Sequence, residues 1–175
     1  MGKTKNKLIN LLSIIIVFVM MSCEDNNGDS SNNEMPIKEV TTTNVNDAAY
    51  YFNLAEGSQN ANLWHLAYQN MDVGGGFAMP SFSLSNSAML AVESSMDFES
   101  IQNSPAPNSF APEGGRMQYG GSNSALTYNM TTHQVSVSSD TYIIYDTVSH
   151  KVFKVHFDDY SSGVVIFRYA ELTSK

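Results

Sequence analysis

The clearest pattern in this chain is the alternation of apolar and polar residues toward its C-terminus. Three short runs rich in β-branched and aromatic residues occur at 141–145, 152–157 and 164–169. Polar segments at 147–150 and 158–163 separate them. Short runs with a period of two, joined by short polar turns, are typical of antiparallel strands. The pattern therefore predicts a three-stranded antiparallel meander.

The middle run of this meander predicts two different faces. Successive side chains of a strand point to opposite sides of the sheet. Phe153, Val155 and Phe157 are therefore expected on one face, and Lys154 and His156 on the other. The apolar face should belong to the core.

The earlier part of the domain contains shorter signals of the same kind. They predict an edge strand at 38–46 and three further strands at 50–54, 63–68 and 88–92. Between and after them we expect a flexible triple-glycine loop at 74–76, one or two helical turns at 96–101 that prolines end, and a long loop without periodicity at 103–123. Repeats, heptads and alternation of strands with helices are absent. The sequence predicts an all-β fold, mostly antiparallel, with one short helix at most. A long loop of this kind is a good candidate for the ligand-facing region.

The N-terminus has the pattern of an export signal. Lys3, Lys5 and Lys7 precede an apolar run of fourteen residues at 8–21, which is too short for a comfortable membrane span. The run ends at Ser22-Cys23, and a small residue directly before the only cysteine is typical of a lipoprotein processing site. We expect a signal peptide at 1–22 and lipidation of Cys23. The alternative is an ordinary signal peptide beside an incidental cysteine.

The next segment, 23–37, is interpreted as the lipidated cysteine followed by a disordered tether. Residues 24–33 contain no large apolar side chain, so they cannot bury enough surface to offset the cost of ordering. The acidic residues after the cysteine resemble the signal that sends lipoproteins of Bacteroidetes to the outer face of the outer membrane. A lipid-anchored, surface-exposed protein at the outer membrane is the expectation. A merely solvated linker is the alternative.

Composition narrows the choice of function. The remaining segment, 38–175, has the size of one domain. The chain has a formal charge of −8 and no basic patch, which argues against nucleic acid as a partner. Phosphate-binding loops, nucleophile elbows and zinc-type ligand pairs are also missing, so we do not expect an enzyme.

Histidine and methionine are the candidate ligands. His65 and His156 lie in expected strands, His150 lies in a turn, and His133 is the most accessible. Seven methionines lie outside the signal: Met35, Met71, Met79, Met89, Met96, Met117 and Met130. Met89 is explained by the core, whereas Met117 and Met130 occupy polar surroundings. A thioether is a soft ligand that can bind haem iron, although methionine also fills irregular gaps in cores.

The chain also resembles the HmuY-like haem-binding lipoproteins, or hemophores, of Bacteroidetes. The stretches that carry the resemblance are YFNL at 51–54, LWHLAY at 63–68, LTYN at 126–129, TYIIY at 141–145, KVHFDDY at 154–160 and GVVIFRY at 163–169. The resemblance implies a compact, mostly antiparallel β-domain that takes up haem or a related porphyrin and passes it to an outer-membrane receptor. It implies no chemistry on the haem.

The resemblance also implies a ligand set. In this family two axial side chains, His or Met, hold the iron. One comes from the long loop and the other follows an aromatic-containing strand. Met117 and Met130 match these places, with His133 as a further candidate. The expected pocket residues are Phe110 and Tyr119 on the porphyrin face, Arg116 beside a propionate, and Tyr128. The rival hypothesis is a surface lipoprotein of the same fold that binds no porphyrin and serves in adhesion or in glycan or protein binding.

Overall fold

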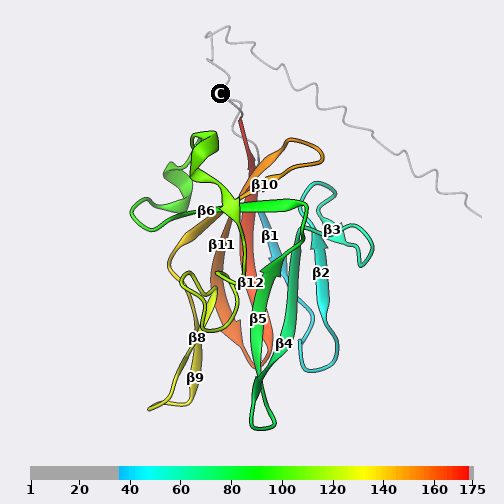
Figure 1. Ribbon diagram of the computed structural model, residues 1–175, viewed down its shortest axis with the longest axis vertical. Coiled ribbons are helices and arrows are strands. Elements are labelled where there is room, and N and C mark those ends of the chain that lie inside the picture. Colours follow the sequence, from blue (N-terminus) through cyan, green and yellow to red (C-terminus); the bar gives the residue numbers. More distant parts are fainter. Residues whose placement is uncertain (1–35, 174–175) are drawn as a thin grey trace, which may run out of the picture. The chain divides into compact units, whose positions relative to one another are not determined.

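The computed structural model describes residues 36–173, which contain twelve β-strands and two three-residue 3₁₀ turns (Figure 1). All pairings between these strands are antiparallel, which confirms the all-β prediction. The signal peptide, Cys23 and all but the last two residues of the expected tether lie outside the described residues. No helix within residues 36–173 is long and apolar enough to cross a membrane.

The larger sheet has six strands and contains the predicted meander. Its order is β1 (Lys38–Thr41), β12 (Val164–Leu172), β11 (Val152–Ser161), β10 (Thr141–Asp146), β6 (Ala88–Glu93) and β7 (Ala111–Pro112). The expected edge strand is thus confirmed as β1, although it is shorter than predicted. The prediction of a polar turn at 158–163 is mostly wrong, because β11 continues to Ser161 past a bulge between Phe157 and Asp159.

The second sheet has four strands, and two of them, the short first strand and the last one, were not predicted. Its order is β3 (Ser58–Gln59), β2 (Tyr50–Asn53), β4 (Leu66–Gly74) and β5 (Phe77–Leu84). The strand expected at 63–68 begins only at Leu66 and runs further. The three glycines at 74–76 form the tight β4–β5 turn, and all have positive φ angles of 88°, 66° and 81°, a conformation that favours glycine.

The remaining elements are small. A separate hairpin consists of β8 (Leu126–Asn129) and β9 (Gln134–Val137). The predicted helical turn is present as η1 (Phe98–Ser100), and the long loop contains a second turn, η2 (Pro107–Ser109). The long loop is therefore partly structured.

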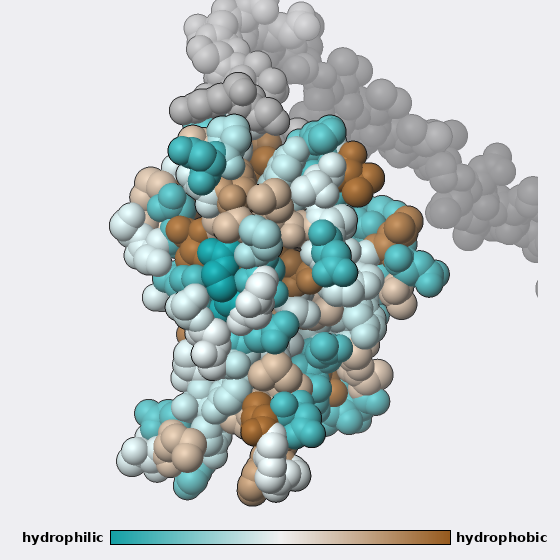
Figure 2. Space-filling view, viewed as in Figure 1, coloured by the Kyte–Doolittle hydropathy of each residue, from teal (hydrophilic) through white to brown (hydrophobic). Residues whose placement is uncertain are grey.

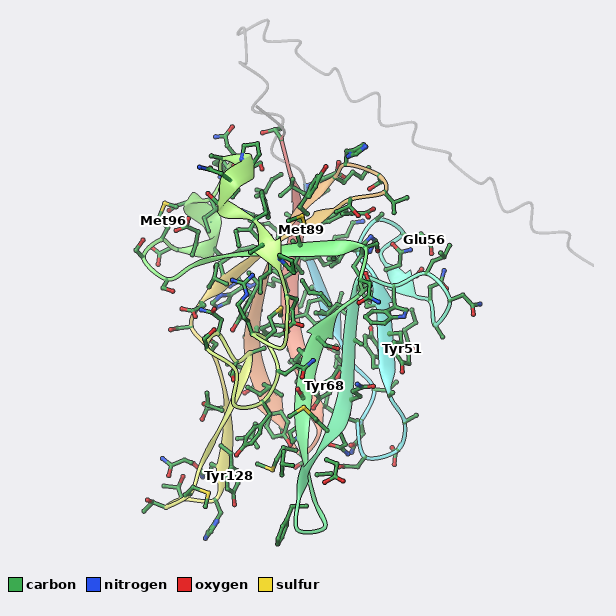
Figure 3. All side chains as sticks on the ribbon, viewed as in Figure 1. Tyr51, Glu56, Tyr68, Met89, Met96 and Tyr128 are labelled. Carbon is green, nitrogen blue, oxygen red and sulfur yellow. The ribbon has the colours of Figure 1, made fainter. Side chains whose placement is uncertain are left out.

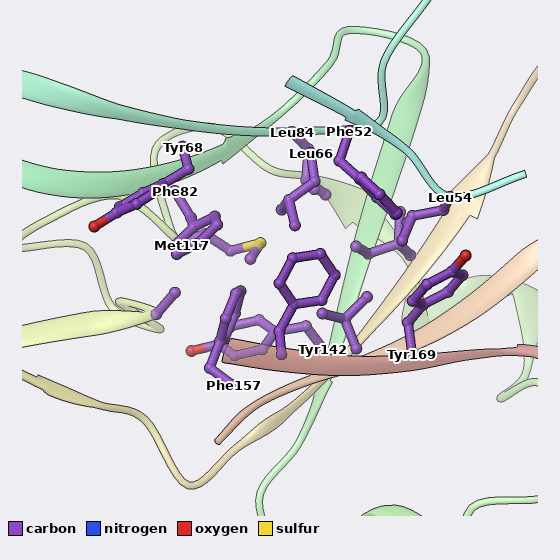
Figure 4. Packing of buried hydrophobic residues seen from close by; sticks show 14 of the residues in the cluster. Phe52, Leu54, Leu66, Tyr68, Phe82, Leu84, Met117, Tyr142, Phe157 and Tyr169 are labelled. Carbon is purple, nitrogen blue, oxygen red and sulfur yellow. The ribbon is translucent and has the colours of Figure 1, made fainter. Parts of the chain in front are cut away.

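Aromatic side chains from both sheets fill the core between them (Figure 4). Phe82 of the four-stranded sheet lies 4.4 Å, between ring centroids, from Phe157 of the six-stranded sheet. Phe52 and Phe167 make a similar contact at 5.5 Å with perpendicular rings. Such edge and offset arrangements are the favourable ones for aromatic pairs. Phe153, Val155 and Phe157, which the alternation predicted on the apolar face, all belong to this core.

The opposite face of the six-stranded sheet is also covered. Lys154 points to this face as predicted, but its side chain is buried, because the η1 segment lies over it. Its Nζ atom donates to the carbonyl oxygens of Phe98 and Ile101, each at 2.8 Å, and lies 4.4 Å from the centre of the Phe98 ring. These contacts hold the η1 segment against the sheet.

The two ends of this domain differ. Lys38 pairs with Tyr169 near the C-terminal end, so the chain enters the domain beside the place where it leaves. We call the expected tether that leads to the domain the leash, and this end of the domain the leash end. The β4–β5 and β8–β9 hairpins project from the opposite end, which we call the hairpin end, and Figure 2 shows their tips as separate projections.

Candidate functional site

A hollow lies at the base of the β8–β9 hairpin. It has a volume of about 470 Å³ and lies between the 119–124 loop and β8. Tyr119 and Tyr128 contribute aromatic rings to its lining, and Asn123 and Asp140 contribute polar groups. Two of the predicted pocket residues, Tyr119 and Tyr128, therefore line one hollow. We call it the hairpin-end hollow.

Glu113 fixes the loop that carries this lining. Its two carboxylate oxygens accept hydrogen bonds from the backbone N–H groups of Gly115, at 2.9 Å, and Met117, at 2.7 Å. The Tyr119 N–H donates to the hydroxyl of Ser81 on the edge strand β5, at 3.0 Å. The loop is thus tied both to itself and to the four-stranded sheet.

The structure does not support Met117 as an iron ligand. Its side chain is fully buried and its sulfur points into the core beside Phe82 and Phe157 (Figure 4). It shares no hollow with Met130, which is 75% exposed. The prediction of a Met117–Met130 pair is therefore wrong for this conformation, because Met117 anchors the long loop by packing.

Arg116 also has a structural role instead of the predicted one. Its guanidinium donates to the carbonyl oxygens of Leu90, Ala111 and Pro112, at distances of 2.9, 3.2 and 3.2 Å. These bonds fasten the loop to β6 and β7. A guanidinium used in this way is poorly placed to pair with a propionate.

Met130 and His133 both lie on the turn of the β8–β9 hairpin. Tyr128, which Figure 3 labels, places its hydroxyl 2.7 Å from Nδ1 of His133. The side chain of Asn129 accepts hydrogen bonds from the N–H groups of Thr131 and Thr132. The turn is therefore well defined, and it exposes the thioether of Met130.

The β10–β11 turn repeats the same local arrangement. There the Tyr145 hydroxyl lies 2.7 Å from Nδ1 of His150, and Asp146 accepts from the N–H groups of Val148 and Ser149. His133 and His150 also share a positive φ angle, 57° and 60°. The common sequence is Tyr-Asx-x-x-x-His, a signal that the sequence reasoning missed. The tyrosine–histidine bond is thus a feature of this kind of turn and is not by itself evidence of a ligand site.

Phe110, the last predicted pocket residue, lines a different hollow at the leash end. This hollow has a volume of about 550 Å³, and Met89, Tyr145, His150 and Val152 also line it. The rings of Phe110 and Tyr145 lie 5.6 Å apart. The predicted set is therefore divided between the core, the hairpin end and the leash end.

The other histidines lie in structural surroundings. His65 is 7% exposed and contacts Asp146. His156 packs near Phe98, and its Nδ1 atom shares a hydrogen bond with the Thr141 hydroxyl. Within residues 36–173 no three His, Cys, Asp or Glu side chains lie close enough together to hold a metal ion.

A buried tyrosine, Tyr142, contacts the loop that lines the hairpin-end hollow. Burial raises its pKa to about 12. Its hydroxyl donates to the carbonyl oxygens of Asn123 and Ser124, each at 3.1 Å. Tyr142 thus holds two residues that line the hollow, Asn123 and Ser124.

Comparison of the chain with profiles of known protein families, with curated proteins and with solved structures finds no match.

Proposed function

We propose that this chain is a surface lipoprotein that binds haem or a related porphyrin at the hairpin end and passes it to an outer-membrane receptor. One observation carries the proposal. An exposed thioether and an accessible imidazole, those of Met130 and His133, lie on a hairpin turn next to a hollow lined by two tyrosines. The resemblance to HmuY-like lipoproteins supports the same ligand.

The donor atoms suit haem iron. Met130 offers a soft sulfur, which is 75% exposed as a side chain and needs no rearrangement of the core to reach a ligand. When Nδ1–H of His133 donates to the Tyr128 hydroxyl oxygen, Nε2 keeps its lone pair for a metal. Histidines that bind metals commonly use their second nitrogen in this way.

The rings of Tyr119 and Tyr128 suit the porphyrin itself. A porphyrin is flat and largely apolar, and ligand sites for such molecules combine aromatic walls with a few polar groups. Both tyrosines line the hollow, together with Leu126. A methionine ligand is an uncharged donor, so binding through Met130 should be stronger for ferrous than for ferric haem.

The position of the site suits transfer to another protein. The chain from Cys23 joins the domain at the leash end, and the hairpins project from the other end (Figure 1). With Cys23 lipidated, the hairpin end would face away from the membrane to which the protein is attached. A bound porphyrin would then be open to a receptor.

A titration tests the proposal. Residues 24–175 are mixed with haem, first oxidised and then reduced with dithionite, while the Soret and Q bands are recorded. We expect a Soret shift that is strongest after reduction and much weaker in Met130→Ala. Met96→Ala is the matched control, because Met96 is a partly exposed methionine of another loop. The absence of a Soret shift in both states would overturn haem binding, and equal spectra for the two variants would remove Met130 from the site.

The polar part of the lining favours a second candidate. Asn123, Asp140 and several serines line the hairpin-end hollow beside the two tyrosines. Aromatic rings next to hydrogen-bonding groups also suit sugars, as in the rival hypothesis of a glycan-binding or adhesion lipoprotein. Glycan binding that is lost in Tyr119→Ala, in a protein that gives no Soret shift, would favour this candidate.

A further inference from the structure

Three segments at the leash end each carry an exposed aliphatic side chain. Ile37, Leu63 and Val148 are 47%, 65% and 76% exposed. They come from distant parts of the sequence: the start of the domain, the loop before β4 and the β10–β11 turn. Large aliphatic groups on exposed loops lose favourable burial unless another apolar phase covers them.

A network of hydrogen bonds holds two of these loops together. The carbonyl oxygen of Leu63 accepts from the Asn53 side chain at 2.9 Å, and the N–H of Val148 donates to Asp146 at 3.0 Å. Nε2 of His65 lies 3.3 Å from the same Asp146 carboxylate. Leu63 and Val148 are thus each two residues from one member of a buried His65–Asp146 pair.

The third side chain, Ile37, is linked to the same region through its neighbour at the start of the domain. Pro36, next to Ile37, lines a small hollow together with Leu54. The Leu54 N–H donates to Nδ1 of His65 at 3.1 Å. The segments that carry the three apolar side chains are therefore linked to one buried pair, His65–Asp146, at the end of the domain where the leash joins it.

We propose that the leash end docks on the bilayer surface through Leu63, Val148 and Ile37. This inference rests on the lipid anchor of the proposed function. Twelve residues lie between Cys23 and Pro36, and a chain of that length spans at most roughly 45 Å. The anchor thus keeps these side chains within reach of the membrane, and weak apolar contacts suffice once an anchor supplies most of the affinity.

The neighbouring aromatic residues suit the same surface. Trp64 follows Leu63, and its ring lies 5.4 Å from that of Tyr51. Tryptophan and tyrosine are enriched where proteins meet the headgroup region of a membrane. Trp64 is the only tryptophan of the chain and therefore a specific fluorescent probe of this contact.

Quenching of Trp64 by brominated lipid tests the proposal. The full lipidated chain is reconstituted into phosphatidylcholine vesicles with acyl chains brominated near the headgroup, and its fluorescence is compared with that in unbrominated vesicles. We expect marked quenching in the wild type. In a Leu63→Asp, Val148→Asp double variant the docked fraction should fall by about tenfold or more, because burial of two aliphatic side chains is lost. Phe77→Asp, at a 72% exposed apolar residue of the hairpin end, is the matched control and should retain the quenching.

Each other outcome has a distinct meaning. Protein that sediments with the vesicles but shows no quenching would overturn docking while leaving the anchor intact. Equal quenching in the wild type, the double variant and the control would show that Leu63 and Val148 do not make the contact with the membrane. Failure of the wild type to remain with the vesicles would overturn the anchor and, with it, the contact, whereas the haem titration does not depend on either result. Near-ultraviolet circular dichroism of the double variant verifies that it folds.

Discussion

The Nε2 atom of His65 lies 3.3 Å from the Oδ2 atom of Asp146, and this contact joins the four-stranded sheet to the six-stranded sheet at the leash end. His65 precedes β4, and Asp146 ends β10. Because the Leu54 N–H donates to Nδ1 of His65, Nδ1 is the acceptor and Nε2 carries the proton that faces the carboxylate. Both side chains are largely buried, at 7% and 5% exposed.

Breaking this pair should destabilise the domain. We expect His65→Ala to lower the free energy of unfolding by about 2–4 kcal/mol, because it leaves the Asp146 carboxylate and the Leu54 N–H without a buried partner. Asp146→Asn should cost less, and Asp47→Asn, at an exposed turn residue, should change stability by about 0.5 kcal/mol or less. Urea unfolding of the single and double variants measures the coupling. Strictly additive losses for His65 and Asp146 would show that the contact contributes nothing of its own.

Acid should weaken the same contact. Burial alone would raise the pKa of Asp146, but hydrogen bonds from Ser149, Val148 and His65 outweigh it and lower this pKa below its ordinary value of 3.8. A carboxyl with a depressed pKa in the folded state stabilises the fold above its unfolded pKa, and this contribution is lost as the pH falls through the folded value. The free energy of unfolding should therefore decrease below about pH 4. Urea midpoints at a series of pH values should show a shallower decrease in Asp146→Asn, and an identical decrease would assign the acid sensitivity to other carboxyls.

Two buried tyrosines should respond differently to loss of the hydroxyl. Tyr68 donates to the Gly163 carbonyl oxygen at 3.1 Å, whereas the buried Tyr169 hydroxyl has no hydrogen-bond partner among residues 36–173. Tyr68→Phe should therefore cost about 1 kcal/mol, and Tyr169→Phe should be neutral or slightly stabilising. Thermal unfolding of the two variants measures the difference. A clear loss in Tyr169→Phe would mean that its hydroxyl has a partner in solution.

The buried position of Met117 gives a prediction that separates packing from ligation. Met117→Leu keeps the volume and apolar character of the side chain, so the free energy of unfolding should fall by less than about 1.5 kcal/mol. Met117→Gln brings an amide into the core and should cost more. Haem titration of the leucine variant provides the second measurement. If Met117→Leu removes the Soret shift while the protein stays folded, the long loop must open to expose its sulfur.

The sequence predicts the C-terminal meander well, because its alternation is long and uninterrupted. The same reasoning misses β5, whose sequence contains Pro80 and small residues in place of an apolar run. A proline cannot donate to a central ladder but is tolerated at an edge, and β5 is the edge of its sheet. Lys154 shows a related limit. Periodicity predicts the sheet face to which Lys154 points. The burial of this side chain depends on η1, a segment more than fifty residues away in the sequence.

The candidate site is less predictable because its residues have no local periodicity. Met117 and Met130 both occur in polar surroundings, yet one is fully buried and the other is exposed. The difference arises from Glu113 and Arg116, whose hydrogen bonds fold the loop so that Met117 enters the core. Such bonds between loops depend on the complete fold and leave no pattern in the sequence.

The direction of β1 has a mechanical consequence. Its first residue, Lys38, lies at the leash end, and the strand runs from there toward the hairpin end along β12. If a partner pulls the hairpin end away from an anchored membrane, the force enters β1 along its axis. All of its hydrogen bonds to β12 then share the load in shear, whereas a leash joined to the other end of β1 would let the same force open them one at a time.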